Sequence, residues 1–375
     1  MSDATIAWVH VGDLHLEDAD GWESLARFEA IIAEVTEHLA GQVDFVFLPG
    51  DNANHGTPDQ YAAMRRALAG LPADLPWRII PGDHDYEPGD LTAYEEAVPP
   101  ANRPEGETIA GHRCIFLDIV SAGAGGPDFR LTMHHRNRLR EELATAAARG
   151  EVPLVFMHAF PEDLAADGAE VAEAFARAGV AFVDTGHTHY NDILNDGAVV
   201  YGATRSTGQI EEDDGQPGYT IVAVHDRVPS WRFRRTGAPF PHVQIVSPCD
   251  LRLVTRPYDP VQVPRPGSVD IVARVFGHSD APVRVSVDDG AETLMTRDGD
   301  GQWRARLVLT AGHRRIRVVC DAGEDRIDLL VRPADQVPKR GPLVAGGHSC
   351  HSVGAWPAAG IAGTQLGPNR NGGKW

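Results

Sequence analysis

Hydrophobic and polar positions follow two different patterns along this chain. From residue 5 to about residue 235, short apolar runs alternate with longer segments in which apolar residues recur at helical spacing. The short runs predict strands and the longer segments predict helices, because each spacing places the apolar side chains on one face of the element. The strands are expected at residues 5–11, 43–48, 77–80, 113–118, 154–157 and 181–184, and the helices at residues 22–39, 58–68, 134–148 and 163–178.

Three further apolar runs, at residues 199–201, 219–225 and 231–235, follow one another without helices between them. We expect these runs to close the sheet as antiparallel strands. Because strands that alternate with helices are typical of a layered α/β domain, residues 1–240 are interpreted as one such domain.

The pattern changes after residue 240. Pro257, Pro260 and Pro264 indicate a linker over residues 241–265. Over residues 266–333 apolar and polar residues alternate with a period of two between Gly/Asp turns, which is typical of a small β-sandwich. This pattern resembles the bacterial immunoglobulin-like modules. Residues 334–375 are rich in Gly, Pro and Ala without periodicity and predict an irregular C-terminal segment.

Composition narrows the range of partners. The net charge of -19 argues against a protein that binds nucleic acid or an anionic membrane non-specifically, since both of these partners bind clustered Lys and Arg. The four cysteines have no metal-binding or redox spacing and are interpreted as reduced thiols. With no secretory signal and no membrane-spanning stretch visible, we expect a cytoplasmic protein. The sequence is compatible with a homo-oligomer.

Acid and imidazole side chains follow the ends of five predicted strands. Carboxyl ends of neighbouring parallel strands meet at one edge of a sheet, so we expect these side chains to converge there. Carboxylate and imidazole suit Zn, Mn or Fe, and eight such groups fit two divalent or trivalent ions that share one carboxylate. The eight residues are Asp13, His15, Asp51, Asp83, His84, His158, His187 and His189.

The order of these residues resembles the signature of the calcineurin-like metallophosphoesterase superfamily. The matching motifs are Asp13-Leu14-His15, Gly50-Asp51, Gly82-Asp83-His84-Asp85, His158 and Gly186-His187-Thr188-His189. The resemblance covers about residues 4–235. It implies a four-layer αββα sandwich, followed here by the immunoglobulin-like β-sandwich and the irregular tail.

The resemblance also implies a role for each residue of the motifs. His84 would be a general acid for the leaving oxygen or a clamp on the phosphoryl group, oriented by Asp85. The metal ligands divide into a first set, a bridge and a second set. The first metal would be held by Asp13, His15 and His189, and the second by Asp83, His158 and His187. Asp51 would bridge the two metals.

Two positions depart from relatives within the superfamily. Asp83 stands where members usually carry Asn, which adds a negative charge and favours substrates of lower charge. His55 stands where the protein-phosphatase relatives have an Arg that grips a phosphomonoester dianion. Both departures favour the branch of cyclic-nucleotide and glycerophosphodiester phosphodiesterases. His55 and Arg205 are the candidate substrate contacts.

The sequence therefore predicts a dinuclear phosphoesterase that hydrolyses a small phosphodiester by attack of metal-bound hydroxide. A cyclic nucleotide or a small organic phosphodiester would be the substrate. One alternative is a DNA-processing nuclease of the same superfamily, although the acidic balance of the chain argues against it. Another is a non-catalytic binding module that retains its metals.

Overall fold

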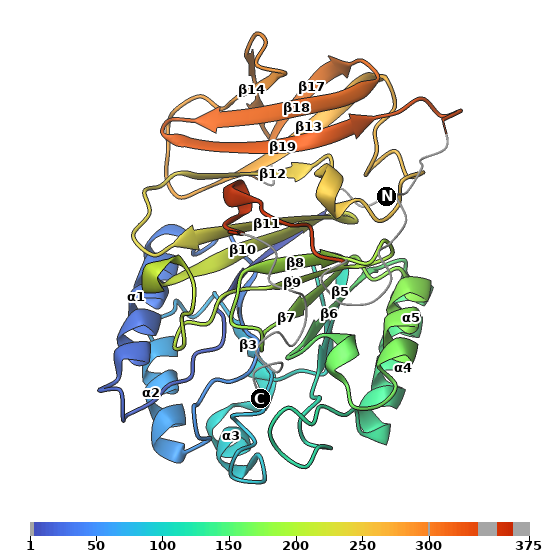
Figure 1. Ribbon diagram of the computed structural model, residues 1–375. Helices are drawn as coiled ribbons and strands as arrows, with labels where there is room; N and C mark the ends of the chain where they lie inside the picture. The colour runs from blue at the N-terminus through green and yellow to red at the C-terminus, as the bar shows by residue number, and fades with distance from the viewer. Residues whose placement is uncertain (1–3, 299–300, 337–350, 363–375) are drawn as a thin grey trace.

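The computed structural model of the chain describes residues 4–298, 301–336 and 351–362 (Figure 1). Two mixed sheets form the larger, lower part of the molecule, and two antiparallel sheets lie above them. Among the described helices, none combines the length and apolar character that crossing a bilayer requires.

The first mixed sheet has the strand order β11-β10-β1-β2-β3, and its three central-to-edge strands β1, β2 and β3 run parallel. Its strands are β1 (Thr5–His10), β2 (Phe45–Leu48), β3 (Trp77–Ile79), β10 (Gly218–His225) and β11 (Val228–Arg235). The helices α1 (Glu23–His38) and α2 (Pro58–Leu68) connect the parallel strands. A capping box formed by Thr57 and Gln60 begins α2, with Pro58 in its first turn.

The second mixed sheet has the order β4-β5-β6-β7-β9-β8. Its strands are β4 (Gly106–Ile109), β5 (His112–Leu117), β6 (Val152–Met157), β7 (Phe182–Thr185), β8 (Asp192–Asn195) and β9 (Val200–Ala203). Its helices are α4 (Met133–Arg149) and α5 (Gly168–Ala178), while α3 (Thr92–Ala97) follows β3. The short 3-10 helices are η1 (Pro100–Asn102), η2 (Pro161–Asp163), η3 (Asp213–Gly215), η4 (Leu251–Leu253) and η6 (Pro357–Ala359).

An aromatic core joins the two mixed sheets. Trp8 of β1 stacks on Phe45 of β2 at 5.8 Å between ring centroids, and Phe116 stacks on Phe156 in the other sheet at 4.6 Å. Separate apolar clusters pack α1 and α2 against the first sheet and α4 and α5 against the second. The helix-sheet-sheet-helix layering of Figure 1 agrees with the α/β core expected from the sequence.

The two upper sheets are antiparallel, with orders β12-β13-β17-β16 and β15-β14-β18-β19, and their inward side chains form one apolar cluster. Their strands are β12 (His242–Ser247), β13 (Gly267–Phe276), β14 (Arg284–Val287), β15 (Thr293–Leu294), β16 (Thr296–Arg297), β17 (Trp303–Leu309), β18 (Gly312–Cys320) and β19 (Gly323–Val331). The immunoglobulin-like classification and the boundaries at residues 240, 265 and 333 stay predictions.

Four expectations need correction. Residues 241–265 were expected to be a linker, yet they supply β12, which pairs with β13 in one of the upper sheets. The helix expected at residues 163–178 begins only at Gly168, because Pro161 starts a 3-10 turn before it. The run at residues 199–201, expected as an antiparallel strand that closes the sheet, belongs to β9, which pairs parallel with β7 and lies inside the second sheet. Residues 351–362 of the predicted irregular tail pack against the mixed sheets, with Trp356 buried. The rest of residues 337–375 lies outside the described residues.

Candidate metal centre

The side chains predicted to bind metal converge beyond the carboxyl ends of the parallel strands. They form two groups, and in each group one nitrogen or oxygen atom per residue lies within 4.8 Å of the others. The first group is Asp13, His15, Asp51 and His189, and the second is Asp51, Asp83, His158 and His187. Because Asp51 belongs to both, the two groups share one carboxylate.

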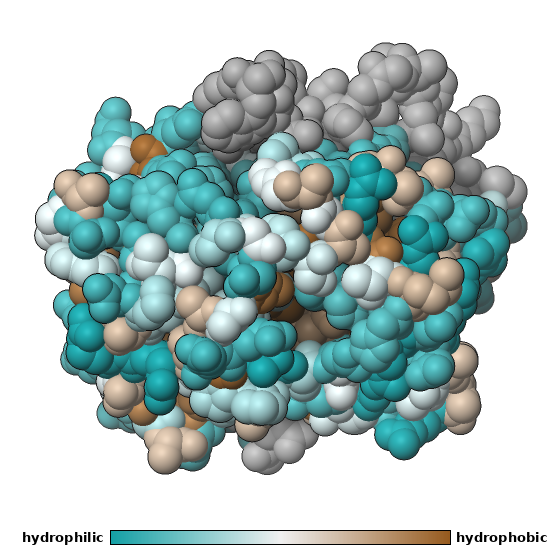
Figure 2. All heavy atoms as spheres, turned by 90° about the horizontal axis from the view of Figure 1, so that it is seen from below, coloured by the Kyte–Doolittle hydropathy of each residue, from teal (hydrophilic) through white to brown (hydrophobic). Residues whose placement is uncertain are grey.

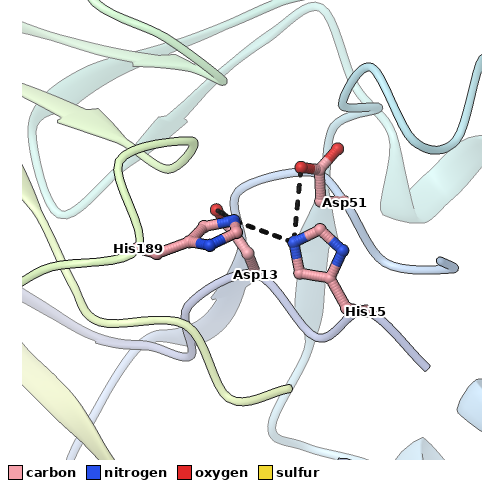
Figure 3. A group of neighbouring side chains, drawn as sticks. All are labelled: Asp13, His15, Asp51 and His189. Atoms are coloured by element: carbon pink, nitrogen blue, oxygen red, sulfur yellow. Dashed lines mark hydrogen bonds and ion pairs between the residues drawn. The ribbon is translucent and has the colours of Figure 1, made fainter. Parts of the chain in front are cut away.

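The first group is arranged around His15 (Figure 3). The imidazole of His15 points toward both His189 and Asp51, with Nε2 2.9 Å from His189 Nε2 and 3.5 Å from Asp51 Oδ2. His189 Nε2 lies 3.6 Å from Asp13 Oδ2. All four side chains are buried.

The second group uses the other oxygen of the shared carboxylate. His158 Nε2 lies 3.4 Å from Asp51 Oδ1 and 3.2 Å from Asp83 Oδ1. His187 Nδ1 lies 3.6 Å from the same oxygen of Asp83. Asp51 therefore directs Oδ2 to the first group and Oδ1 to the second, which is the geometry of a bridging ligand.

Hydrogen bonds fix the tautomers of two of these imidazoles. His15 Nδ1 lies 3.1 Å from Asn54 Oδ1, and His158 Nδ1 lies 2.8 Å from the carbonyl oxygen of Pro49. Both partners are acceptors, so each Nδ1 carries a proton and each Nε2 is the nitrogen that faces the candidate site. Such outer contacts orient metal-ligating imidazoles.

The electrostatics of the first group favour a cation. Burial, opposed by the charge of Asp51, lowers the pKa of His15 to about 4, and burial also lowers the pKa of His189. Two neutral imidazoles thus face each other at 2.9 Å. Asp13 Oδ1 is buried without a hydrogen-bond partner among the residues that the structure describes. Converging lone pairs and an unpartnered carboxylate oxygen fit a bound metal ion.

Backbone conformation at the site is unusual. His15, Asp51, His187 and His189 have φ values of 41°, 51°, 67° and 63°, in the left-handed region that non-glycine residues rarely occupy. Each such residue costs on the order of 1–3 kcal/mol, and these conformations cluster at functional sites. Their concentration at four of the seven candidate ligands indicates that the loops are shaped for binding.

A family model of calcineurin-like phosphoesterases matches residues 8–191. This part of the chain belongs to the calcineurin-like phosphoesterase family. The match begins in β1 and contains all seven candidate metal ligands.

Several individual proteins are similar to this chain. The 3',5'-cyclic adenosine monophosphate phosphodiesterase CpdA of Escherichia coli is 26% identical over 141 residues, which are 37% of this chain and 48% of that protein. The chain thus spans about half the length of that relative. A probable cyclic nucleotide phosphodiesterase of Rhodococcus erythropolis is 24% identical over 269 residues, 64% of this chain and 86% of that protein. The solved structure of a dimetal phosphatase from Danio rerio aligns at 13% identity and a TM-score of 0.46, covering 62% of this chain and 97% of its own.

His84, next to Asp83 in the phosphoesterase motif, borders both groups. Its ring lies 4.6 Å from that of His15, and its backbone N–H donates to Asp51 Oδ1 at 3.0 Å. His84 Nδ1 donates to the carbonyl oxygen of Asn54 at 2.8 Å, which leaves Nε2 as the free nitrogen.

The expected contact from Asp85 to His84 needs correction. The buried carboxylate of Asp85 instead accepts hydrogen bonds from Gly82 N at 2.8 Å, Ala53 N at 3.1 Å and the hydroxyl of Tyr61 at 2.7 Å. Asp85 therefore joins the loop after β2 to the loop after β3. The residue that orients His84 is Asn54, which sequence reasoning missed because the contact uses a main-chain carbonyl that any residue could provide.

The two candidate substrate contacts have different surroundings. Arg205 is 3% exposed, its guanidinium pairs with Glu212 at 3.0 Å and Asp213 at 2.9 Å, and it lies over the ring of Phe233. The expectation that Arg205 meets a phosphate is therefore wrong, because its charge is buried and paired. His55 is half-exposed between Glu17 and Glu87 and stays a candidate.

A third group of metal-binding side chain types lies on the surface away from these two. It consists of Glu105, His134 and His135. Glu105 already pairs with Arg138 at 2.9 Å and with His134 at 2.5 Å. An adjacent guanidinium competes with a cation for this carboxylate, so the surface group is a poorer metal site than the two buried groups.

The face of the molecule below the mixed sheets, on which α3 lies, is mostly hydrophilic and is hollowed near its centre (Figure 2). The loop that connects β3 to α3 runs toward this face, and its sequence includes Asp83 and His84.

Proposed function

We propose that this chain is a dinuclear metal-dependent phosphodiesterase that hydrolyses a small phosphodiester such as a cyclic nucleotide. The observation that carries the proposal is the orientation of the Asp51 carboxylate, which directs one oxygen toward each of the two ligand groups. Two Mn, Fe or Zn ions bound there would polarise a phosphoryl oxygen and lower the pKa of a water molecule. Both curated relatives described above carry names of cyclic nucleotide phosphodiesterases, which supports the substrate class.

The charge of the candidate ligands favours a diester over a monoester. Asp13, Asp51 and Asp83 would offset three of the four charges on two divalent cations and leave one positive charge. A phosphodiester carries one negative charge, whereas a phosphomonoester carries up to two near neutral pH. The site with Asp83 therefore complements a monoanion better than a site with Asn there.

His84 would act on the substrate through Nε2, because Nδ1 donates to Asn54. In that position Nε2 either donates a proton to the leaving oxygen or holds a phosphoryl oxygen by a hydrogen bond. His55 would lie near the substrate, and the flanking carboxylates of Glu17 and Glu87 would discourage a second anionic group.

The proposal extends to the rest of the chain. Residues 1–240 would form the catalytic domain and residues 266–333 an immunoglobulin-like domain. The protein would be located in the cytoplasm, and its substrate would be a small molecule rather than nucleic acid.

Metal analysis combined with three substrates tests the proposal. Purified full-length protein should bind two equivalents of Mn²⁺ and hydrolyse bis-(p-nitrophenyl) phosphate and cyclic AMP faster than p-nitrophenyl phosphate. Asp51→Ala, which removes the shared carboxylate, should lose both metal equivalents and turnover. Two bound ions without turnover of any ester would support a binding module instead, and cleavage of single-stranded DNA with Mn²⁺ would support the nuclease.

A further inference from the structure

Residues 351–362 run along the edge of the second mixed sheet, beside β8. Asn195 N donates to the carbonyl oxygen of His351 at 2.8 Å, and Val353 N donates to the carbonyl oxygen of Ile193 at 3.0 Å. An edge strand presents unpaired backbone groups, and this antiparallel pairing covers those of β8. The C-terminal segment is therefore built into the sheet.

Burial of apolar side chains anchors the same segment. Trp356 is 4% exposed and belongs to the cluster between the mixed sheets, together with the fully buried Ala359 and Ile361. The guanidinium groups of Arg232 and Arg252 lie 4.9 Å and 4.8 Å from the Trp356 ring. Cation–π contacts and apolar burial together fix the position of the turn that follows Trp356.

This turn brings a main-chain carbonyl to Asn191. Gly360 has a φ of +77°, and a Cβ atom there would lie 2.5 Å from Cβ of Phe233. Only glycine fits this close approach to β11. The carbonyl oxygen of Gly360 accepts a hydrogen bond from Asn191 Nδ2 at 3.2 Å.

Asn191 is fully buried and connects three parts of the chain. Its Oδ1 accepts hydrogen bonds from the hydroxyl of Thr204 at 3.2 Å and from Arg205 N at 3.1 Å. Its backbone N–H donates to Glu212 Oε1 at 3.0 Å. The carboxamide thus joins the C-terminal segment to the loop that follows β9.

This loop contacts two candidate metal ligands. Ser206 N donates to the carbonyl oxygen of His189 at 3.2 Å, and the Ser206 hydroxyl donates to the carbonyl oxygen of Asp13 at 2.8 Å. Asn191 also follows His189 by two positions in the same loop. His189 and Asp13 both belong to the first ligand group, so Asn191 supports that group from two directions.

We propose that Asn191 is a positioning residue for the first ligand group, held in place by residues 351–362 through Gly360. The inference rests on the proposed function, because it concerns the affinity of the same metal centre. His189 has a strained backbone, with a φ of 63°, that persists only while surrounding contacts hold it. Loss of the Asn191 contacts would let the loop relax and move the His189 imidazole away from its partners.

Two glycines with nearly identical backbone provide the test in the full-length chain. Gly360 has a φ of +77° and Gly237 a φ of +78°, but a Cβ at Gly237 would meet no atom within 4 Å. Gly360→Ala and Gly237→Ala therefore share the backbone strain, and only the first displaces the carbonyl that Asn191 contacts. Calorimetric titration with Mn²⁺ should show that Gly360→Ala weakens binding of one of the two ions about tenfold or more, a size typical of lost outer contacts. Gly237→Ala should keep both affinities.

Asn191→Ala provides a second route to the same measurement and decides the matter if Gly360→Ala does not fold. It should weaken the same Mn²⁺ equivalent, and thermal unfolding of the metal-free variants shows that the protein is folded. Unchanged Mn²⁺ affinities in folded variants, or an equal loss in Gly237→Ala, would overturn the inference while leaving the proposed function intact. Wild-type protein that binds no Mn²⁺ would overturn both.

Discussion

Asp83 gives the candidate metal centre a third carboxylate, and its surroundings favour the ionised form of this side chain. Burial raises its pKa, but hydrogen bonds from His158 and His187 outweigh this effect and hold the pKa well below its usual value. The charge at this residue is therefore available to a cation. Neighbouring His84 shares the loop, and its Nδ1 donates to the carbonyl oxygen of Asn54, which leaves Nε2 as the free nitrogen.

Replacing Asp83 with Asn removes one negative charge while keeping the size of the side chain. We expect Asp83→Asn to weaken binding of one Mn²⁺ ion by about tenfold and to lower the preference for diester over monoester substrates. Titration with Mn²⁺ and the ratio of kcat/KM for the two nitrophenyl esters measure both effects. Asp90→Asn, which changes an exposed carboxylate in the following turn, is the control. Unchanged affinity and ratio would place residue 83 outside the ligand set.

Removing the imidazole of His84 should separate catalysis from metal binding. His84→Ala is expected to reduce kcat by roughly a hundredfold or more, the usual contribution of a general acid, while metal content stays near that of the wild type. Elemental analysis and steady-state kinetics on the same samples provide the comparison. His134→Ala removes an exposed imidazole far along the chain and should change neither quantity. Parallel loss of metal and turnover would remove the catalytic assignment of His84.

At the scale of elements, the strand ends could be predicted and many of their partners could not. An apolar run that meets Gly marks where a strand ends, and the parallel strands of the two mixed sheets together bring Asp13, Asp51 and His158 close to one another. The partners of Arg205 depend on η3 and its neighbours, which carry no periodic signal. The sequence does not reveal β8, because only Ile193 and Leu194 are apolar in it, or β12, because it precedes a proline-rich stretch.

Gly82, in the loop after β3, permits this loop to touch the loop after β2. A Cβ at Gly82 would lie 2.2 Å from Asp51 Oδ1 and 2.3 Å from its backbone nitrogen, an atom that cannot rotate away. We expect Gly82→Ala to displace Asp51, lower the metal content and cost about 1–3 kcal/mol of stability, as overpacking does. Gly89→Ala, at a φ of +92° with no atom within 4 Å, should cost stability but retain the metals. Metal analysis decides, and full occupancy in Gly82→Ala would contradict the expectation.

At the scale of the whole molecule, a buried ion pair joins the mixed sheets to the upper sheets. Arg232 of β11 pairs with Asp325 of β19 through two hydrogen bonds of 2.7 Å and 3.1 Å, and Asp325 also accepts from Ile245 N. Both charged side chains are about 3% exposed. Because burial removes both groups from water, each charge is stabilised mainly by its partner.

Removing one partner should therefore be costly. Asp325→Ala leaves the Arg232 guanidinium buried without its counter-charge and is expected to destabilise the protein by about 3–5 kcal/mol. Asp270→Ala breaks a comparable two-bond pair with Arg306, but that pair is exposed and its loss should cost far less stability. Urea unfolding of both variants measures the difference, and similar costs would show that the buried pair contributes no more than the exposed one.

The upper sheets also cover apolar surface of the mixed sheets. Val246 of β12 and Val272 and Phe276 of β13 belong to the same cluster as the residues that pack α1 against the first sheet. A chain shortened to residues 1–240 would expose this apolar surface to water, and an exposed apolar patch promotes self-association. Residues 1–240 prepared alone should therefore precipitate or dimerise, unless the apolar side chains that contact Val246, Val272 and Phe276 in the whole protein are replaced by polar ones.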